Sequence, residues 1–290
     1  MEESAMNIQW YPGHMTKTRR MIADQLRHMD AVCEILDARV PLSSRNPDVE
    51  ELTGNKPRLI VLNRVDLADP AGTRAWSAWF RGQGFAVLEA NARQGQGVGQ
   101  FPGAVRSLLS DKLAAYAERG QAGRMLRVMI LGIPNVGKST FINQIAGRKT
   151  AKTEDRPGVT RAKQWVPVDR SLEVLDTPGM LWPRFEDPGV GFRLACTGAV
   201  RDEIMDLEEL ASRLTAYLGS RYPQALLDRY GIEAQAEDSG YDLLTRAGRK
   251  RGFLIRGGEV DTERMARILL DEFRSGKLGR FTLELPPAFS

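Results

Sequence analysis

The chain has 290 residues, a formal net charge of +4 at pH 7, and 42% hydrophobic and 27% charged residues. This is the composition of an ordinary globular protein, long enough for about two domains of ~150 residues. Cys33 and Cys196 lie far apart in apolar segments, which argues against a disulfide framework or a metal cluster, and we expect both to be core thiols. The sequence has no apolar run near ~18 residues and no signal-peptide pattern, so we expect a cytoplasmic protein without a membrane partner.

An aromatic and turn-forming motif, WYPGHM at residues 10–15, precedes the first predicted helix. Apolar residues such as Ile22 and Leu26 then recur at helical spacing on one face, and the basic residues lie largely elsewhere. The basic side is typical of a solvated surface, although it could also meet phosphate. By its residue type alone, His14 is more typical of a surface or turn histidine than of a catalytic one.

A buried strand and the four residues that follow it form the next unit. After strand-like residues 31–41, residues 58–66 read RLIVLNRVD, so Asn63, Arg64, Val65 and Asp66 stand at the carboxyl end of a strand, where open α/β sheets bind ligands. N-K-x-D at such a place is how GTPases select guanine: the Asp carboxylate accepts hydrogen bonds from the base, the Asn holds the loop and the Lys stem covers the base. An Arg at the second position can stack on a purine equally well.

The following strand-like segment, residues 85–98, carries a weaker signal. Asn91, Ala92 and Arg93 stand where GTPases have S-A-K, so the backbone N–H of Ala92 would reach the guanine O6 whatever the side chains are. Residues 99–124 then predict one amphipathic helix and a polar linker.

The strongest motif lies between a buried strand and a helix, in the sequence RVMILGIPNVGKST at residues 127–140. It fits G-x-x-x-x-G-K-[ST], whose glycines let backbone N–H groups curl around a di- or triphosphate. Lys138 would place its charge at the β/γ-phosphates and Ser139 would bind Mg²⁺, next to a favourable helix N-terminus. The predicted nucleotide contacts are Asn135, Val136, Gly137, Lys138, Ser139 and Thr140. The strand before the loop and the helix after it disfavour the alternative, a plain glycine turn.

Two later segments complete the set. Thr160 lies in a polar stretch, where its hydroxyl would bind Mg²⁺ and sense the γ-phosphate, although alone it could be an ordinary loop threonine. LEVLDTPG, residues 172–179, is a strand that ends in Asp176, which can hold a Mg²⁺-bound water, and in Gly179, whose amide can contact the γ-phosphate. Together, these strand-end motifs are highly specific.

In this combination the sequence resembles the Ras-like GTPase superfamily, with the guanine motifs placed before the phosphate motifs and the cyclic order kept. Such an order is similar to that of circularly permuted GTPases. WYPGHM, GIPNVGKST and the tail GKLGRFTLE closely resemble the ribosome biogenesis GTPase A family, over nearly the whole chain. Because all the loops gather on one sheet edge, a permuted chain can build the same pocket.

The resemblance implies an α/β fold: a circularly permuted P-loop GTPase with a mostly parallel, doubly wound sheet and a C-terminal α-helical domain. We expect an N-terminal arm with the PGHM motif at residues 1–20, the GTPase domain at 21–189, and a helical domain that binds RNA or the ribosome at 190–290. It also implies GTP and GDP as ligands, with Mg²⁺ held through Ser139, Thr160 and Asp176.

The chain has apolar residues where many related GTPases carry a catalytic glutamine. Met180 and Leu181 stand where many Ras-like proteins carry a glutamine that orients the attacking water, so another group must do so. The family points to His14, with Lys138 and Thr160 as further catalytic residues, although His14 could instead cap or pack. Asn135 can help to bind K⁺, or merely brace its loop. We expect slow hydrolysis by the protein alone.

The C-terminal region predicts helices over residues 194–218 and 261–279, the second capped by Asp261 and ended by Gly276. Its basic residues are Arg246, Arg249, Lys250, Arg251, Arg256, Arg264, Arg267, Arg274, Lys277 and Arg280. A solvated surface would account for them, but the resemblance favours ribosomal RNA and the large-subunit precursor as partners. We expect no DNA partner and a monomer in solution.

The resemblance thus implies a GTPase that assists maturation of the large ribosomal subunit and is stimulated by the pre-ribosomal particle. An alternative is a nucleotide-gated RNA-binding assembly factor in which hydrolysis is incidental. A third possibility, an ATP-dependent phosphotransferase, would require ATP to compete well with GTP for the pocket.

Overall fold

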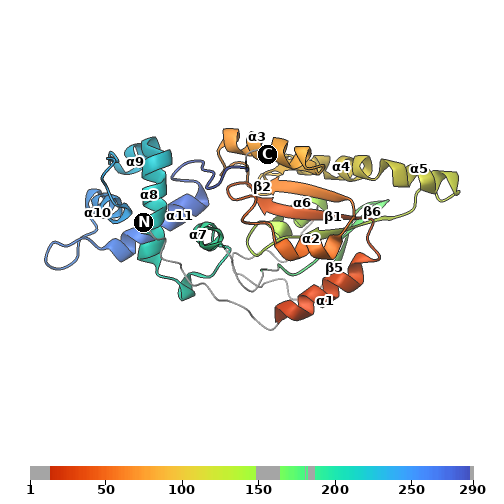
Figure 1. Cartoon of the computed structure of the whole chain (residues 1–290), viewed down its shortest axis with the longest axis horizontal. Helices are drawn as coiled ribbons and strands as arrows, with labels where there is room; N and C mark the ends of the chain where they lie inside the picture. Colours follow the sequence, from red (N-terminus) through yellow and green to blue (C-terminus); the bar gives the residue numbers. More distant parts are fainter. Residues whose placement is uncertain (1–13, 148–163, 180, 182–186, 288–290) are drawn as a thin grey trace. The chain divides into compact units, whose positions relative to one another are not determined.

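The structure, a computed structural model, describes residues 14–147, 164–179, 181 and 187–287 (Figure 1). The described residues form two compact units: the first comprises the chain up to residue 181 together with 282–287, and the second comprises 187–281. The prediction had put residues 282–287 with the C-terminal domain, whereas they pack with the first unit. The roles assigned to the arm, the GTPase domain and the C-terminal domain stay predictions.

A six-stranded, mostly parallel sheet forms the centre of the first unit (Figure 1). The strand order is β3-β2-β1-β4-β6-β5, and β5 runs antiparallel to β6. β1, β2 and β4 are buried along nearly their whole length, which is typical of parallel strands covered on both faces. The strands are β1 Ala31–Asp37, β2 Arg58–Asn63, β3 Ala86–Ala90, β4 Leu126–Leu131, β5 Gln164–Asp169 and β6 Leu172–Asp176.

The helices of the first unit cover both faces of this sheet. They are α1 His14–Leu26, α2 Pro47–Thr53, α3 Pro70–Gly82, η1 Val98–Gln100, α4 Phe101–Leu108, α5 Ser110–Glu118 and α6 Lys138–Ile145. The crossovers through α2 and α3 run outward from β1 in one direction, whereas those through α4 and α6 run in the other. Because parallel crossovers are right-handed, this reversal puts α4 on the opposite face, and the contact between Phe101 of α4 and Phe141 of α6 places α6 there too. The sheet is therefore doubly wound, as predicted.

Apolar side chains fill the space between the helices and the sheet. The cluster between α1, α2 and the sheet consists of Ile22, Leu26, Met29, Val32, Val49, Met129, Leu131 and Leu175, and that between α3 and the sheet of Leu36, Ala38, Ile60, Leu62, Ala68, Trp76 and Phe80. Phe101 of α4 and Phe141 of α6 meet edge to face, with ring centroids 5.4 Å apart. Burial of these residues fixes the order and register of the strands.

The register aligns the carboxyl ends of neighbouring strands. Asn63 is paired with Asp37 of β1 on one side and with Ala90 of β3 on the other, and Ile130 of β4 is paired with Asp176 of β6. The loops that leave these strands therefore start from one rim of the sheet. β1 lies between β2 and β4, so the guanine motif at residues 63–66 and the phosphate motif at 127–140 are close in space although residues 67–126 separate them in the chain.

The second unit is helical. Its elements are α7 Pro188–Cys196, η2 Asp202–Ile204, α8 Leu207–Arg221, α9 Pro223–Tyr230, α10 Gly240–Lys250 and α11 Thr262–Ser275. α8 packs against both α10 and α11. The predicted limits of the last helix are confirmed: the Asp261 side chain accepts a hydrogen bond from the Arg264 N–H, and Gly276 ends the helix with φ of 81°.

Two segments predicted to be single helices are each divided into several elements in the structure. Residues 99–124 form α4 and α5, which are separated at Leu109 (φ −107°, ψ 18°) and end at Glu118. Residues 194–218 contain the end of α7, a connecting segment that includes the short 3-10 helix η2, and most of α8. The apolar pattern runs across the first break because Leu109 is itself buried, so periodicity alone did not reveal it.

Two expectations from composition have structural counterparts. Cys33 and Cys196 are buried free thiols, as predicted. In the part of the chain that the structure describes, no helix combines the length and the apolar character needed to cross a membrane.

One buried carboxylate gathers several hydrogen bonds in the second unit. Glu272 of α11 accepts from Arg229 Nε at 2.9 Å, from the Tyr230 hydroxyl at 2.8 Å and from Arg251 Nη2 at 3.0 Å. Its side chain is 10% exposed. The hydrogen bonds from Arg229, helped by those from Tyr230 and by the nearby guanidinium charges, hold the pKa of Glu272 below its ordinary value of 4.5.

This depressed pKa predicts a pH-dependent stability of the second unit. A lowered carboxyl pKa stabilises the folded state above the ordinary value of 4.5, and this contribution is lost as pH falls through the folded pKa. We expect Glu272→Gln to lower the free energy of opening of α11 by about 2 kcal/mol at pH 7, and by less at pH 3.5. Hydrogen exchange of α11 amides, compared between variant and parent at each pH, measures this. The exposed Glu259→Gln serves as control, and an equal deficit at both pH values would contradict the prediction.

Candidate active site

The loop between β4 and α6 has a backbone that requires glycine at one position. Gly137 has φ of 89°, and a Cβ there would lie 2.4 Å from Asn63 Nδ2. Asn135, two residues earlier, also has a positive φ of 62°. Such a left-handed turn directly before a helix turns successive backbone N–H groups inward and forms a concave site for anions. The predicted phosphate loop thus has the backbone that phosphate binding needs.

Lys138 and Asp176 form a buried ion pair beside this loop. Lys138 Nζ donates to Asp176 Oδ1, and the two side chains are 6% and 2% exposed. Burial lowers the pKa of Lys138 below its ordinary value, although the Asp176 carboxylate opposes this effect. The structure therefore brings together the cation predicted to bind β/γ-phosphates and the carboxylate predicted to act at Mg²⁺.

The segment after β6 lies against the phosphate loop. The Thr177 hydroxyl donates to the Ile130 carbonyl at 2.8 Å, which fixes the end of β6 beside β4. A Cβ on Gly179 would lie 3.0 Å from the backbone N of Pro134, so the two loops touch and leave little room for a side chain. This is where an amide of Gly179 would be needed to reach a γ-phosphate.

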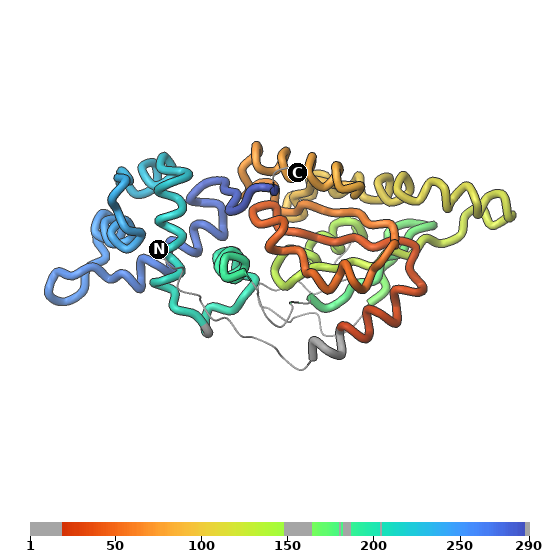
Figure 2. Tube along the Cα trace, viewed as in Figure 1, coloured from red at the N-terminus to blue at the C-terminus, as the bar shows by residue number. Residues whose placement is uncertain are grey.

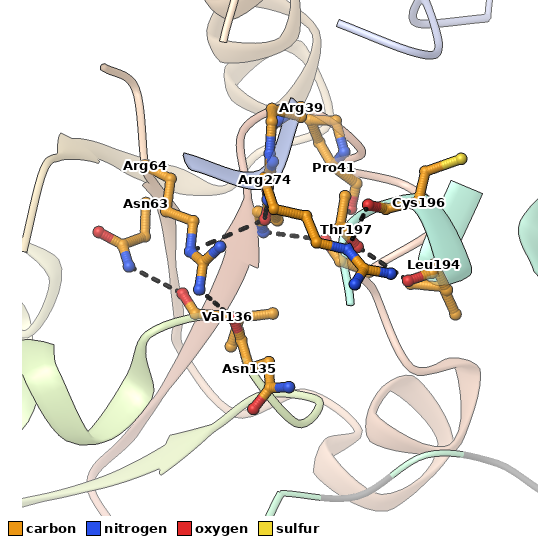
Figure 3. A network of polar contacts seen from close by, with 12 residues as sticks. Arg39, Pro41, Asn63, Arg64, Asn135, Val136, Leu194, Cys196, Thr197 and Arg274 are labelled. Atoms are coloured by element: carbon orange, nitrogen blue, oxygen red, sulfur yellow. Dashed lines mark hydrogen bonds and ion pairs between the residues drawn. The ribbon is translucent and has the colours of Figure 1, made fainter. Parts of the chain in front are cut away.

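Asn63 joins the guanine motifs to the phosphate loop. Its Nδ2 donates to the Val136 carbonyl at 2.8 Å, and its Oδ1 accepts from the Ala92 N–H at 3.0 Å (Figure 3 shows the first of these). The side chain is almost fully buried. One amide group thus connects three loops that the sequence assigned to a single pocket.

Arg64 also reaches the phosphate loop. Its Nη2 donates to the Asn135 carbonyl at 2.6 Å, and its Nε lies 3.9 Å from Asp37 Oδ2 (Figure 3). The residue has φ of 64°, a left-handed conformation that is uncommon for a side chain other than glycine. The Val65 N–H donates to the Ala90 carbonyl at 3.3 Å, and Asp66 is partly exposed at the same rim.

The remaining predicted residues divide into two groups. Asn91 is buried after β3, and Ser139 and Thr140 are partly buried in the first turn of α6. Thr160 lies outside the described residues. His14 begins α1, and its side chain lies outside the described part of the chain.

A buried pair of charged residues that no sequence motif indicated, Asp37 and Arg39, also lies at this rim. Asp37 accepts hydrogen bonds from Arg39 Nε at 3.0 Å and Nη2 at 2.8 Å, and both side chains are buried. Burial alone would raise the pKa of Asp37, but the guanidinium groups of Arg39 and Arg64 hold it below its ordinary value of 3.8. The signal that could have revealed the pair is an acidic and a basic residue two positions apart at the carboxyl end of a strand predicted to be buried.

The donor set fits a magnesium ion shared with phosphates. Mg²⁺ prefers oxygen ligands and usually takes only one or two from the protein, the rest coming from water and phosphate. The Ser139 hydroxyl and the Asp176 carboxylate are such oxygens. Within residues 14–147, 164–179, 181 and 187–287, no group of three or more His, Cys, Asp or Glu could hold a metal ion.

Comparisons with known proteins agree with this geometry. Residues 127–212 match the family model described as 50S ribosome-binding GTPase. The chain is 45% identical to ribosome biogenesis GTPase A of Bacillus cereus, with 98% of this chain and 96% of that protein covered. Ribosome biogenesis GTPase A of Thermotoga maritima is 31% identical, with 96% and 95% covered. Mitochondrial ribosome-associated GTPase 1 of Mus musculus is 33% identical, with 95% and 89% covered.

Solved structures are similar in fold. The crystal structure of GNP-bound YlqF from T. maritima matches with a TM-score of 0.63 and 28% identity, over 93% of this chain and 98% of that one. A GDP-bound structure of TM YlqF matches with a TM-score of 0.65 and 29% identity, over 92% and 99%.

The doubly wound sheet, the phosphate loop and the guanine motifs at its rim define a circularly permuted P-loop GTPase. At 45% identity over nearly its whole length, the chain belongs to the ribosome biogenesis GTPase A family. It is a GTPase, and its nucleotide ligands are GTP and GDP.

The bridging role of Asn63 predicts a loss of nucleotide affinity on its removal. Asn63→Ala leaves the Val136 carbonyl and the Ala92 N–H without their partner, so the loops lose their alignment. We expect the Kd for GDP to rise roughly 10- to 100-fold, about 1.4 to 2.8 kcal/mol. Titration with a fluorescent GDP analogue measures this, and Asn55→Ala, an exposed asparagine before β2, is the matched control. An unchanged Kd in a folded Asn63 variant would contradict the assignment.

Proposed function

We propose that the protein assists assembly of the large ribosomal subunit and that the pre-ribosomal particle stimulates its GTPase activity. The observation that supports the nucleotide part is the Asn63 amide, which is hydrogen-bonded to both the Val136 carbonyl and the Ala92 N–H and so joins the loops assigned to the phosphates and to the base. The ribosomal part is supported by the description of the matching family model and by the names of the relatives.

In this proposal the guanine base lies at the rim formed by β2 and β3. The Asp66 carboxylate accepts from the N–H groups of the Watson–Crick edge, and the Ala92 N–H, which already donates to Asn63 Oδ1, shares its hydrogen with guanine O6. The Arg64 side chain covers the face of the purine, where lysine is usual. Its contact with the Asn135 carbonyl supports this role, because it holds the guanidinium between the base loop and the phosphate loop.

The phosphates lie over the loop at residues 132–140, whose N–H groups and Lys138 ammonium neutralise their charge. Ser139, Thr160 and Asp176 would hold Mg²⁺, which supplies further charge neutralisation when bound. The Gly179 amide contacts the γ-phosphate, and its closeness to Pro134 supports this.

The attacking water needs an orienting group that the usual position lacks. Leu181 is apolar and 2% exposed, so it cannot hydrogen-bond to water. We assign the role to His14, whose neutral imidazole can accept a hydrogen bond from water. The docked particle helps to bring His14 to the γ-phosphate, so the protein alone hydrolyses GTP slowly.

Asn135 supplies a site for K⁺ next to the phosphates. A cation there would stabilise the charge that develops in the transition state, as an arginine finger does. The positive φ of Asn135 supports this assignment, because it keeps the residue at the bend of the phosphate loop.

The second unit is the proposed RNA-binding part. Of its predicted basic residues, Arg246, Arg251 and Arg274 form ion pairs with Asp238, Glu272 and Asp202. These three serve the fold, so they are removed from the proposed RNA surface. Those left exposed are Arg249, Lys250, Arg256, Arg264, Arg267, Lys277 and Arg280, of which Arg267 forms an exposed ion pair with Glu263. Such a positively charged surface suits the phosphate backbone of ribosomal RNA.

The alternative, in which GTP only gates RNA binding and hydrolysis is incidental, shares the same site and surface. The cytoplasmic location, the monomeric state and the absence of a DNA partner stay predictions.

Single-turnover hydrolysis distinguishes the two functions. With the protein in excess over GTP and in K⁺, we expect large-subunit precursor particles to raise the rate of the parent protein, and His14→Ala to lower that stimulated rate by ~10² to 10⁴. His28→Ala, on the other histidine of the chain, is the matched control. The catalytic account fails if particles leave the rate unchanged and the His14 variant is silent, and the gating alternative then stands. ATP that competes well with GTP would instead favour a phosphotransferase.

The cation assignment has its own test. In the parent protein we expect hydrolysis in K⁺ to exceed that in Na⁺ at equal ionic strength by the order of 10²-fold, the size of one transition-state contact. Asn135→Gly keeps the positive φ accessible and removes the side chain, so the K⁺ advantage should fall towards one. An unchanged K⁺ to Na⁺ ratio in this variant would leave Asn135 only a bracing role.

A further inference from the structure

The last described residues of the chain return to the first unit and are hydrogen-bonded to it. The Leu283 N–H donates to the Arg39 carbonyl at 2.8 Å. The Ser43 N–H and hydroxyl donate to the Glu284 carboxylate at 2.8 and 2.5 Å, and the Trp76 indole N–H donates to the Glu284 carbonyl at 2.9 Å. In Figure 2 the blue end of the trace runs beside α3, as these bonds require. We call residues 282–284 the tail segment.

The tail segment is built into the packing of the first unit. Thr282 and Leu283 are 2% and 5% exposed, and Trp76 is fully buried. A Cβ on Gly72 of α3 would lie 2.6 Å from Thr282 Oγ1, so α3 has a glycine where the tail crosses it. An incidental surface contact would not need such a close fit.

The tail segment is hydrogen-bonded to the loop at residues 37–44, which follows β1 and is held together by its own hydrogen bonds. The Asp37 N–H donates to Ser44 Oγ at 3.0 Å, the Val40 N–H to the Asp37 carbonyl at 2.9 Å, and the Ser44 N–H to the Val40 carbonyl at 2.8 Å. Arg39 and Ser43, which hold the tail, belong to this loop. A force on the tail therefore acts on Asp37 through a compact, hydrogen-bonded turn.

From Asp37 the contacts continue to the guanine and phosphate loops. Its carboxylate holds the buried Arg39 and lies 3.9 Å from Arg64 Nε, and Arg64 Nη2 donates to the Asn135 carbonyl at 2.6 Å. Beside this path, the Ala38 N–H donates to the Asn63 carbonyl at 2.8 Å. An unbroken series of polar contacts thus joins the tail to the residues assigned to the nucleotide.

We propose that the tail segment is a positioning element of the nucleotide site, which acts through Arg39 and Asp37 to hold Arg64 over the guanine and so slows the release of GDP. This rests on the role of Arg64 in the proposed function. Arg64 has φ of 64°, a conformation that persists only where the surroundings enforce it, and Asp37 and Asn135 are such surroundings.

The position of the tail in the chain gives this contact a regulatory use. The second unit ends at residue 281, and the tail starts at the next residue. A partner that pulls on the second unit therefore acts on the tail through one peptide bond. Loosening of the tail lowers the affinity for GDP, and by thermodynamic reciprocity bound GDP holds the tail in place.

Stopped-flow release of a fluorescent GDP analogue from the full chain tests the proposal. We expect Glu284→Ala to speed release about 5- to 10-fold and Ser43→Ala, which removes one hydroxyl contact, about 2- to 3-fold. Arg64→Ala should speed release roughly 10-fold by removing the cover on the base. In Arg64→Ala/Glu284→Ala the tail effect should disappear, since residues that act in one network are not additive.

Glu237→Gln, an exposed carboxylate of the second unit, is the control and should release GDP at the parent rate. Thermal unfolding of each variant checks that the fold is kept. If Glu284→Ala does not fold, Ser43→Ala decides, because its N–H still binds Glu284. The proposal is overturned if the tail variants release GDP at the parent rate, or if the Glu284 effect is undiminished in the Arg64→Ala background.

The same data separate this proposal from the proposed function. If Arg64→Ala leaves both GDP release and the preference for GDP over ADP unchanged, the assignment of Arg64 to guanine fails, and the tail proposal fails with it. If Arg64→Ala speeds release while the tail variants are silent, the guanine site stands and the tail segment only anchors the chain.

Discussion

The alignment of the loops at the sheet rim depends on one buried amide, that of Asn63. An amide side chain shielded from water must find partners for its donor and its acceptor, and Asn63 finds them in the Val136 carbonyl and the Ala92 N–H. Both partners are available only if β2, β3 and β4 end at the same rim in the observed register. If any of the loops after β2, β3 and β4 were displaced, a buried polar group would lose its hydrogen-bond partner. The need for these hydrogen bonds therefore aligns the three loops with one another.

This constraint explains why a rotated order of motifs can build the pocket. The site needs β2, β1, β4 and β6 to be neighbours in the sheet, and neighbours are chosen by buried apolar surface and ladder hydrogen bonds, whatever their order in the chain. What the rotation changes is where the chain goes next. Residues 187–281 follow the loop after β6, and the tail then returns to the first unit at Arg39 and Ser43. The chain therefore enters and leaves the second unit from segments close to nucleotide loops.

Residues whose position is set by the neighbouring strand could be predicted from the sequence. Residues whose role depends on partners distant in the chain could not. Asn63 and Asp176 are the last residues of β2 and β6, and Lys138 begins α6 after the loop that follows β4, so their place at the rim followed from strand context. The break at Leu109 was missed because a buried leucine continues the apolar period across it. The Asp37–Arg39 pair and the tail segment were missed for another reason: their meaning comes from partners that are distant in sequence, such as Arg64 and Trp76.

Lys138 and Asp176 are buried, and each supplies the opposite charge that the other needs. A buried ammonium is costly without an anion, and the Asp176 carboxylate supplies one, which opposes the lowering of the Lys138 pKa by burial. The phosphates of GTP offer the same ammonium an alternative anion, and Mg²⁺ offers the carboxylate an alternative cation. In the proposed function, binding exchanges one compensated pair of buried charges for two. This exchange would favour nucleotide and metal together over either alone, because each buried charge then keeps a partner.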